Sequence, residues 1–350
     1  MKFIFMIEKC VRRKLEHTYD NYINNCGFSG TDAQILEMSH WLNKMGHDST
    51  IVKDTDLQKI KNVHDIDVFC PSFYGWLHNV IDFCKRLGKD TKILLYVQSL
   101  GDCQRLFNLR KKCFIVGVSD YVKMFYHRYD YPYKTIYNAV NDEIFTNNDL
   151  DYASKKGNFV FFASYERGGE ICVKIFNKLV KTYPDIKLHI TSYEPEDKSR
   201  ISSNNKNILK YSSLSKKEIK LLLDKCDYFI YPLVNHNTGS VHHDTFACVV
   251  LEALACGVSV VSWDVACMKS IYRDDIYLIK PPVCNCYDPY QQFGHNKNML
   301  TDESINLFVD KVKEIEADQN FKLTKKLQAR EWALSHTWKN KTKELLDFIA

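Results

Sequence analysis

The stretch of residues 228–263 most constrains the fold, because its apolar residues follow two different periods in turn. An apolar run at its start has the length of a buried strand and is closed by Pro232, which cannot donate to a sheet. After a polar loop, apolar residues recur at helical spacing from Thr245 to Gly257, where a helix C-cap is expected. A second strand follows at once. The stretch therefore predicts strand, loop, helix and strand, the repeating unit of a parallel sheet.

The same alternation extends along the chain. Strand-like runs occur at 1–7, 48–52, 68–70, 93–97, 114–118, 135–137, 159–162, 188–191, 228–231, 258–261 and 276–279. Helical patterns lie between most of these runs, which predicts an α/β protein with parallel sheets and helices on both faces. In such sheets, ligands bind beyond the carboxyl ends of the strands.

The chain is long enough for two domains. Its 350 residues exceed what one hydrophobic core usually serves, and residues 141–156 form a polar stretch with little periodicity. We therefore expect an N-terminal domain at 1–148, a second domain at 149–330 and a C-terminal helix at 331–350 that packs back on the first domain.

Charge and cysteine usage exclude some functions. A net charge of +5 from 48 basic and 43 acidic residues does not indicate a nucleic-acid binder, although it leaves peripheral contact with a membrane open. The 13 cysteines are spread through predicted strands and helices, which favours reduced thiols in a cytoplasmic protein. No apolar run approaches ~20 residues, so we expect a soluble or peripherally membrane-associated protein.

Two carboxylates mark the predicted helix of the first stretch. Asp244 stands at its expected N-terminus and Glu252 follows eight residues later, so the two could serve two parts of one extended ligand. The backbone amides of residues 246–248 would carry the positive end of the helix dipole and could hold a phosphate. An N-capping aspartate before a core helix explains the same residues without a ligand.

Several segments, taken in order, resemble the retaining glycosyltransferases of GT-B fold, specifically glycosyltransferase family 4, the glycosyl transferases group 1. The segments are the glycine turn 27–32, the serine turn 118–126, residues 133–145, the basic turn 161–176, the two-carboxylate signature 244–262 and the tryptophan-containing tail 332–348. The resemblance implies two Rossmann-like domains that face a central cleft. The acceptor would bind the N-terminal domain and a nucleotide-sugar donor the C-terminal one.

The resemblance also implies roles for single residues. Glu252 would bind ribose hydroxyls of the donor, and Asp244 would lie beside the donor sugar as a catalytic residue. Arg167 would neutralise the diphosphate and stabilise the leaving group. The other donor-binding residues would be Phe246, Ala247 and Cys248 through their amides, Gly30 and Ser164 near the phosphates, and Tyr211 and Leu214 near the base.

This chain departs from the family pattern at several positions. Asp244 replaces the usual glutamate, and Ser164 lies where the basic turn usually supplies a second cation, so Lys174 or another residue would have to help. Gln98 and Ser99 follow the strand after which many relatives have a histidine near the reacting carbon. With His243, these two residues would lie near the acceptor and the donor sugar.

Two metal motifs compete with this interpretation. Asp65 and Asp67 could form the Asp-x-Asp motif of a different glycosyltransferase fold, but they precede a strand instead of following one. His242 and His243 lie near His236, but adjacent histidines seldom bind the same ion, and we expect them to meet sugar hydroxyls or phosphate.

The resemblance thus implies a metal-independent, retaining glycosyltransferase without a cofactor. It would move a sugar from a nucleotide-diphosphate sugar to a hydroxyl of a glycan, a lipid-linked or a protein-linked acceptor. A catalytically inactive nucleotide-sugar or glycan-binding protein is the alternative, and another GT-B activity such as an epimerase is a third. The sequence does not indicate the base, the sugar, the acceptor or the oligomeric state.

Overall fold

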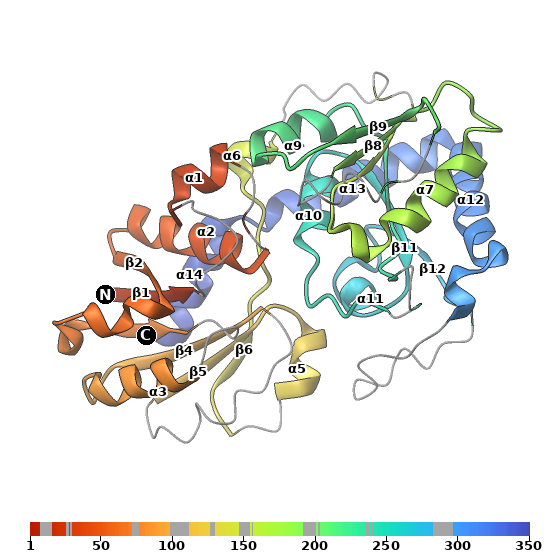
Figure 1. Ribbon diagram of the computed structural model, residues 1–350. Coiled ribbons are helices and arrows are strands. Elements are labelled where there is room, and N and C mark those ends of the chain that lie inside the picture. The colour runs from red at the N-terminus through yellow and green to blue at the C-terminus, as the bar shows by residue number, and fades with distance from the viewer. Residues whose placement is uncertain are drawn as a thin grey trace. The chain divides into compact units, whose positions relative to one another are not determined.

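Two compact units make up the chain in a computed structural model (Figure 1). The structure describes residues 1–7, 16–25, 28, 30–71, 77–98, 112–126, 130–146, 155, 157–191, 201, 204–235, 239, 241–282 and 297–350. The first unit comprises residues 1–22, 28–138 and 337–350, and the second comprises 23–27 and 139–336. The second unit therefore contains the whole stretch with the two carboxylates.

A six-stranded parallel sheet forms the first unit in the described residues. Its strands are β1 (Lys2–Ile7), β2 (Asp48–Lys53), β3 (Val68–Cys70), β4 (Lys92–Val97), β5 (Lys112–Gly117) and β6 (Tyr133–Thr135), in the order β2-β1-β3-β4-β5-β6. Strands β1, β3 and β4 are almost wholly buried, as expected of strands that helices cover on both faces.

A second six-stranded parallel sheet forms the other unit in the part of the chain that the structure describes. Its strands are β7 (Phe159–Phe161), β8 (Leu188–Thr191), β9 (Ile208–Tyr211), β10 (Tyr228–Tyr231), β11 (Ser259–Trp263) and β12 (Tyr277–Ile279), in the order β12-β11-β10-β7-β8-β9. The chain runs outward from β7 through β8 to β9, then returns to β10 on the other side of β7. The boundary between β7 and β10 is thus the switch point beyond which open α/β sheets bind ligands.

Helices flank these sheets (Figure 1). They are α1 (Tyr19–Asn24), α2 (Gly30–Lys44), α3 (Leu77–Arg86), α5 (Asp120–Tyr126), α6 (Asp142–Phe145), α7 (Gly169–Leu179), α9 (Lys216–Leu223), α10 (Cys248–Ala255), α11 (Cys267–Tyr272), α12 (Asp302–Ala317), α13 (Gln319–Ser335) and α14 (Trp338–Ile349). Short 3-10 helices are η1 (Asp54–Lys59), η2 (Val63–Asp65), η4 (Tyr165–Arg167) and η5 (Lys297–Leu300). The predicted fold class is confirmed, including a last helix, α14, that packs on α2 of the first unit.

Three local expectations differ from the structure. The sequence predicted neither helix α1 nor strand β9. Strand β9 lies at the edge of its sheet and is half-buried, so its sequence lacks a continuous apolar run. Helix α10 begins at Cys248 and not at Thr245.

Asp67, one member of the Asp-x-Asp pair, has a structural role. Its carboxylate accepts a hydrogen bond from the backbone N–H of Lys2 at 2.7 Å, and its carbonyl accepts from the N–H of Lys92 at 2.9 Å. Asp67, just before β3, thus bonds to the first residues of the neighbouring strands β1 and β4, which accounts for an aspartate at this position.

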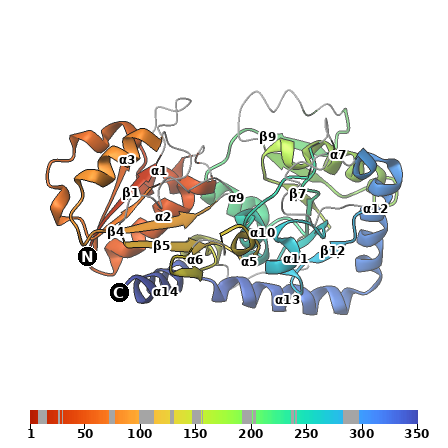
Figure 2. The ribbon, with the colours of Figure 1, turned by 90° about the horizontal axis from the view of Figure 1, so that it is seen from below.

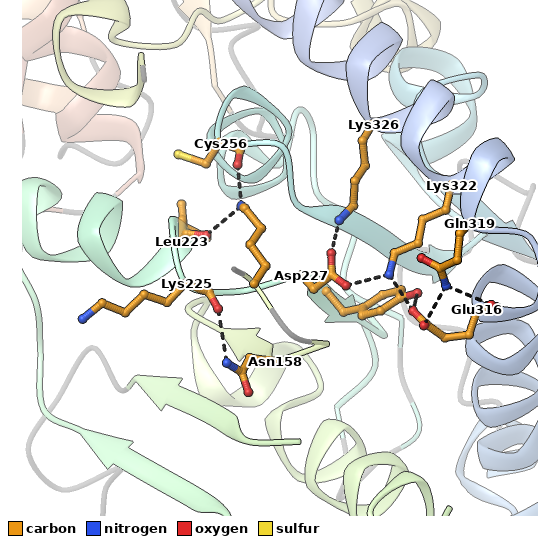
Figure 3. Close-up of polar contacts among 11 residues, drawn as sticks. Asn158, Leu223, Lys225, Asp227, Cys256, Glu316, Gln319, Lys322 and Lys326 are labelled. Atoms are coloured by element: carbon orange, nitrogen blue, oxygen red, sulfur yellow. Dashed lines mark hydrogen bonds and ion pairs between the residues drawn. The ribbon is translucent and has the colours of Figure 1, made fainter. Parts of the chain in front are cut away.

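A buried charge cluster joins the start of β10 to α13, the long helix that also packs on α10 (Figures 2 and 3). The Asp227 carboxylate accepts from the ammonium groups of Lys322, at 2.6 Å, and Lys326. Lys322 also donates to Glu316 at 2.6 Å, and the Tyr228 hydroxyl donates to the same carboxylate. Asp227, Lys322 and Lys326 are each at most 6% exposed, so their charges depend on one another.

Replacing Asp227 by alanine should therefore destabilise the second unit strongly. It leaves two buried ammonium groups short of a carboxylate, which costs about 3–5 kcal/mol. Urea unfolding followed by circular dichroism measures the loss. Asp310→Ala is the control, because its pair with Lys313 is 3.8 Å long and exposed, and it should cost less than about 1 kcal/mol. Equal losses in the two variants would contradict the role assigned to Asp227.

Candidate active site

Arg167, Tyr231 and Asp244 meet at the switch point of the second sheet. Arg167 ends the 3-10 turn after β7, and Tyr231 is the last residue of β10. The Arg167 guanidinium pairs with Oδ1 of Asp244, and the buried Tyr231 hydroxyl donates to Oδ2 at 2.5 Å. Asp244 is buried, whereas the Arg167 side chain is 39% exposed. The Arg167 guanidinium is therefore fixed by Asp244 and still partly exposed to solvent, at the edge where such a sheet binds ligands.

The loop after β10 folds back to bring Asp244 to Tyr231. Val234 and Val241 form an isolated antiparallel bridge, and the N–H of His242 donates to the carbonyl of Leu233 at 2.8 Å. This return places residues that are 13 positions apart in the sequence side by side. The pairing of Tyr231 with Asp244 follows from the fold of the loop and has no signature in the sequence.

Gly168 lets the Arg167 turn lie against the end of β10. Its φ is +112°, in the left-handed region that favours glycine, and a Cβ at this position would lie 2.9 Å from the ring of Pro232. The Arg167 N–H donates to the carbonyl of Ser164 at 2.9 Å and closes the turn. The glycine thus allows the close approach that brings Arg167 within reach of Asp244.

The segment between Asp244 and α10 differs from the sequence expectation. Ala247 adopts a left-handed conformation with φ 55° and ψ 62°, so Asp244 precedes the first helical residue by four positions and does not cap the helix. The Tyr272 hydroxyl donates to the carbonyls of Phe246 at 2.8 Å and Ala247 at 3.2 Å. Of the three residues expected to present amides to a phosphate, only Cys248 belongs to α10.

Backbone strain gathers at this edge of the second sheet. Within the described ranges, three non-glycine residues have positive φ: Leu233 at 57°, Ala247 at 55° and Ala266 at 50°. Leu233 and Ala266 follow β10 and β11, and Ala247 precedes α10. Left-handed backbone costs roughly 1–3 kcal/mol per residue and clusters at functional sites, so its grouping here supports a binding edge.

Glu252 lies one turn into α10 and is paired with Lys216 on α9. The Lys216 ammonium contacts Oε1 of Glu252, and the two side chains are 17% and 8% exposed. The other oxygen, Oε2, is buried and has no hydrogen-bond partner among the described residues. Since buried carboxylate oxygens normally have partners, Oε2 is an acceptor that a ligand hydroxyl could use.

A capping box starts the helix that carries Lys216. Ser215 caps α9, and its side chain and backbone exchange hydrogen bonds with Glu218 in a complete capping box. Lys216 is the first helical residue after this cap. The cap therefore fixes the position from which its side chain reaches Glu252.

Lys155 joins the far ends of the same two helices. Its fully buried ammonium donates to the carbonyl of Leu223, the last residue of α9, at 3.1 Å. It also donates to the carbonyl of Cys256, the residue after α10, at 2.7 Å (both acceptor residues are labelled in Figure 3). Helix C-termini carry partial negative charge, which favours a cation there. Burial nevertheless lowers the pKa of Lys155 to about 8, although nearby Cys256, Cys226 and Asp224 oppose the shift.

The sequence did not single out Tyr231, Tyr272, Lys216 or Lys155. A lysine in a polar stretch, as Lys155 is, gives no sign that it becomes buried. Lys216 follows the Ser215 helix cap, but its partner Glu252 is 36 positions away in the sequence. Only the tyrosine at the end of a buried strand, Tyr231, had a usable signal, because polar groups at carboxyl ends of parallel strands face the ligand edge.

Other predicted donor residues lie around the same sheet. Tyr211 ends β9, and its hydroxyl is 2.9 Å from Nδ1 of His189, whose ring stacks on it. Burial lowers the pKa of His189 to about 4, so this ring is neutral near pH 7. Leu214 is half-buried just before the α9 cap, and Ser164 starts the Arg167 turn. Lys174 is bound to Glu170 on α7 at 3.0 Å.

The histidines of the loop show no metal arrangement. His242 donates through Nε2 to the carbonyl of Glu166 at 3.0 Å, and burial lowers the pKa of His242 and of His243. Among the described residues, no group of three or more His, Cys, Asp or Glu could hold a metal ion. His236 lies outside the described residues.

Two predicted residues belong to the first unit. Gly30 is the first residue of α2, and a Cβ there would meet no atom within 4 Å. The side-chain amide of Gln98, just after β4, exchanges two hydrogen bonds of 3.0 Å with Asn138, which also accepts from Tyr96 at 2.7 Å. Ser99 lies outside the described residues.

The comparisons with known proteins agree with this geometry. Residues 156–283, which contain Arg167, Lys216, Asp244 and Glu252, match the family described as glycosyl transferases group 1. The chain also resembles solved glycosyltransferase structures over almost its whole length. The fold is that of the GT-B glycosyltransferases.

Three of these structures show the extent of the similarity. Sucrose-phosphate synthase from Thermosynechococcus elongatus has a TM-score of 0.70 at 10% identity, covering 99% of this chain and 98% of that one. A glycosyltransferase from Rickettsia africae has a TM-score of 0.67 at 12% identity, with 99% and 97% covered. HepE from Anabaena, solved with UDP and glucose, has a TM-score of 0.64 at 12% identity, with 99% and 98% covered.

The expected resemblance to the glycosyl transferases group 1 is confirmed over residues 156–283, and the solved structures extend the likeness in fold to almost the whole chain. A comparison with curated protein sequences finds no match. In the part of the chain that the structure describes, no helix combines the length and apolar character needed to span a membrane.

Gly168→Ala should separate Arg167 from Asp244. The new Cβ clashes with Pro232 and requires a strained φ, so we expect a loss of about 1–3 kcal/mol in the free energy of unfolding. Gly30→Ala is the control, because its Cβ would enter open space and should change stability by less than about 0.5 kcal/mol. Urea unfolding of both variants measures the difference. An unchanged Gly168→Ala protein would show that the turn does not need glycine.

The pKa of Lys155 predicts a pH-dependent stability difference. Because the folded lysine has a pKa of about 8 and an unfolded lysine about 10.5, the unfolded state binds more protons between these values. The free energy of unfolding of wild type, relative to Lys155→Met, should therefore rise from pH 8 to 10.5 by up to about 3 kcal/mol. Unfolding curves across this range test it. A difference that stays constant or falls would contradict the lowered pKa.

Proposed function

We propose that this protein transfers a sugar from a nucleotide-diphosphate sugar to an acceptor hydroxyl, with retention of the anomeric configuration. The observation that carries the proposal is Glu252, a buried carboxylate inside the segment that matches the glycosyl transferases group 1. One of its oxygens has no hydrogen-bond partner in the part of the chain that the structure describes. A hydroxyl-rich ligand such as a ribose supplies the missing partner.

The donor would extend from Glu252 to the switch point. Glu252 accepts from the ribose, and the N-terminus of α10, about 6 Å along the helix axis, faces the diphosphate. Arg167 approaches the same phosphates with its exposed guanidinium. The positive charge that the diphosphate needs would come from Arg167 and the helix dipole, so the proposal requires no metal ion and no cofactor.

Retention would follow from the position of the leaving group. The acceptor hydroxyl attacks the anomeric carbon from the face that the diphosphate leaves, and an oxygen of the departing diphosphate takes the hydroxyl proton. Arg167 stabilises the charge that develops on this leaving group. Asp244 acts in this scheme beside the donor sugar or through Arg167, to which its carboxylate is bound.

The acceptor would bind the first unit, which carries Gly30 and Gln98. A glycan, a lipid-linked or a protein-linked hydroxyl fits the proposed chemistry equally well. A cytoplasmic location is supported by the cysteines, since eight in the described ranges are free thiols and seven of those are buried. The structure of HepE contains UDP and glucose, so UDP-glucose is a sensible first donor to test.

Donor binding should depend on Glu252. A thermal-shift screen with UDP, GDP and ADP should identify the base, because a ligand at 100 times its dissociation constant adds roughly 2.7 kcal/mol. Glu252→Ala should abolish the shift that the matching nucleotide gives. Glu303→Ala on α12, at an exposed position, is the control and should keep it. An undiminished shift in Glu252→Ala would refute the assignment.

A second experiment measures turnover of the nucleotide sugar whose base the screen identifies. Hydrolysis of the matching nucleotide sugar by wild type, lost in Arg167→Ala with binding retained, would support transfer chemistry and a transition-state role for Arg167. Binding without hydrolysis or transfer would favour the alternative, a catalytically inactive nucleotide-sugar-binding protein.

A further inference from the structure

Lys216 is a half-buried cation paired with Glu252, the proposed ribose-binding residue. Its ammonium contacts Oε1 of Glu252. The other oxygen, Oε2, has no hydrogen-bond partner among the described residues. A carboxylate that is 8% exposed would be costly without a nearby cation. Lys216 therefore offsets the burial of Glu252 and also determines which of its two oxygens is left for another hydrogen-bond donor.

The position of Lys216 is fixed from three sides. The Ser215–Glu218 capping box sets its backbone, and its ammonium lies 5.9 Å from the centre of the Phe145 ring, within range of a cation–π interaction. At the other end of the two helices, Lys155 holds the carbonyls that end α9 and α10. The register between the helices, and with it the pairing of Lys216 with Glu252, is therefore held at both ends.

We infer that Lys216 is a positioning residue of the donor site. It fixes the Glu252 carboxylate so that Oε2 accepts a ribose hydroxyl, and it does not itself bind the phosphates, because its ammonium is directed to Glu252, one helical turn from the α10 N-terminus. The inference rests on the proposed function and adds a residue to the part of the donor site that binds the ribose. The chain thereby places a second cation at the donor site, although Ser164 stands where the family usually has one.

Binding of nucleoside mono- and diphosphates separates this role from a phosphate contact. With the base identified by titration calorimetry of UDP, GDP and ADP, Lys216→Met should weaken the mono- and the diphosphate by the same factor, about ten-fold or more. Lys217→Met is the matched control: it is the next residue of α9, is exposed and donates to Asn24 at 2.8 Å. It should change either affinity by less than about two-fold.

A double-mutant cycle tests whether Lys216 acts through Glu252. In the Glu252→Gln background, Lys216→Met should alter affinity by less than about two-fold, because the carboxylate that it positions is gone. Additive losses, or a loss confined to the diphosphate, would overturn the inference and show that Lys216 contacts the ligand itself. Circular dichroism checks that each variant is folded.

Lys216→Gln covers the case in which the methionine variant does not fold. Its amide can still donate to Oε1 without the charge, so it should show a smaller loss that is again equal for the mono- and the diphosphate. If wild type binds no nucleotide, the proposed function fails together with this inference. If wild type binds and the cycle is additive, only the role of Lys216 fails.

Discussion

The divergence of the chain at β7 and β10 determines where the chemistry of the second unit can lie. From these neighbouring strands the chain continues in opposite directions along the sheet, and open α/β sheets bind ligands beyond the carboxyl ends of such a pair. Arg167 reaches this edge from the turn after β7, and Asp244 reaches it from the folded-back loop after β10. The close approach of Gly168 to Pro232 allows the two segments to meet there.

Buried charges couple the stability of this unit to its proposed site. Asp227 ties β10 to α13 through two lysines, and Lys155 ties the ends of α9 and α10 (Figure 3). The same two helices carry Lys216 and Glu252. Lys155 can therefore affect donor binding without contacting the donor, because it sets the register of the two helices that carry Lys216 and Glu252.

Periodicity was enough to predict the parallel sheets and the helices between them, because burial of strands and helices leaves a repeating apolar pattern. The switch point needed the strand order, which the sequence did not predict. Local conformation was harder. The left-handed Ala247 shortens α10 and removes Asp244 from its N-terminus, yet an alanine gives no signal of positive φ. The cations paired with Asp244 and Glu252 lie 77 and 36 positions away, and no local pattern specifies such pairs. The resemblance indicated the carboxylates but not the cations that hold them.

Asp244 and Glu252 therefore differ in what they can offer a ligand. Arg167 and Tyr231 already occupy both oxygens of Asp244, whereas Oε2 of Glu252 has no partner among the described residues. Because Asp244 is one methylene shorter than a glutamate, its charge stays close to the backbone and to Arg167. Within the proposed reaction, Asp244 is then better suited to orient the guanidinium that meets the diphosphate, and Glu252 to recognise the donor directly. The two carboxylates of one sequence signature would thus act through different partners at the two ends of a single donor.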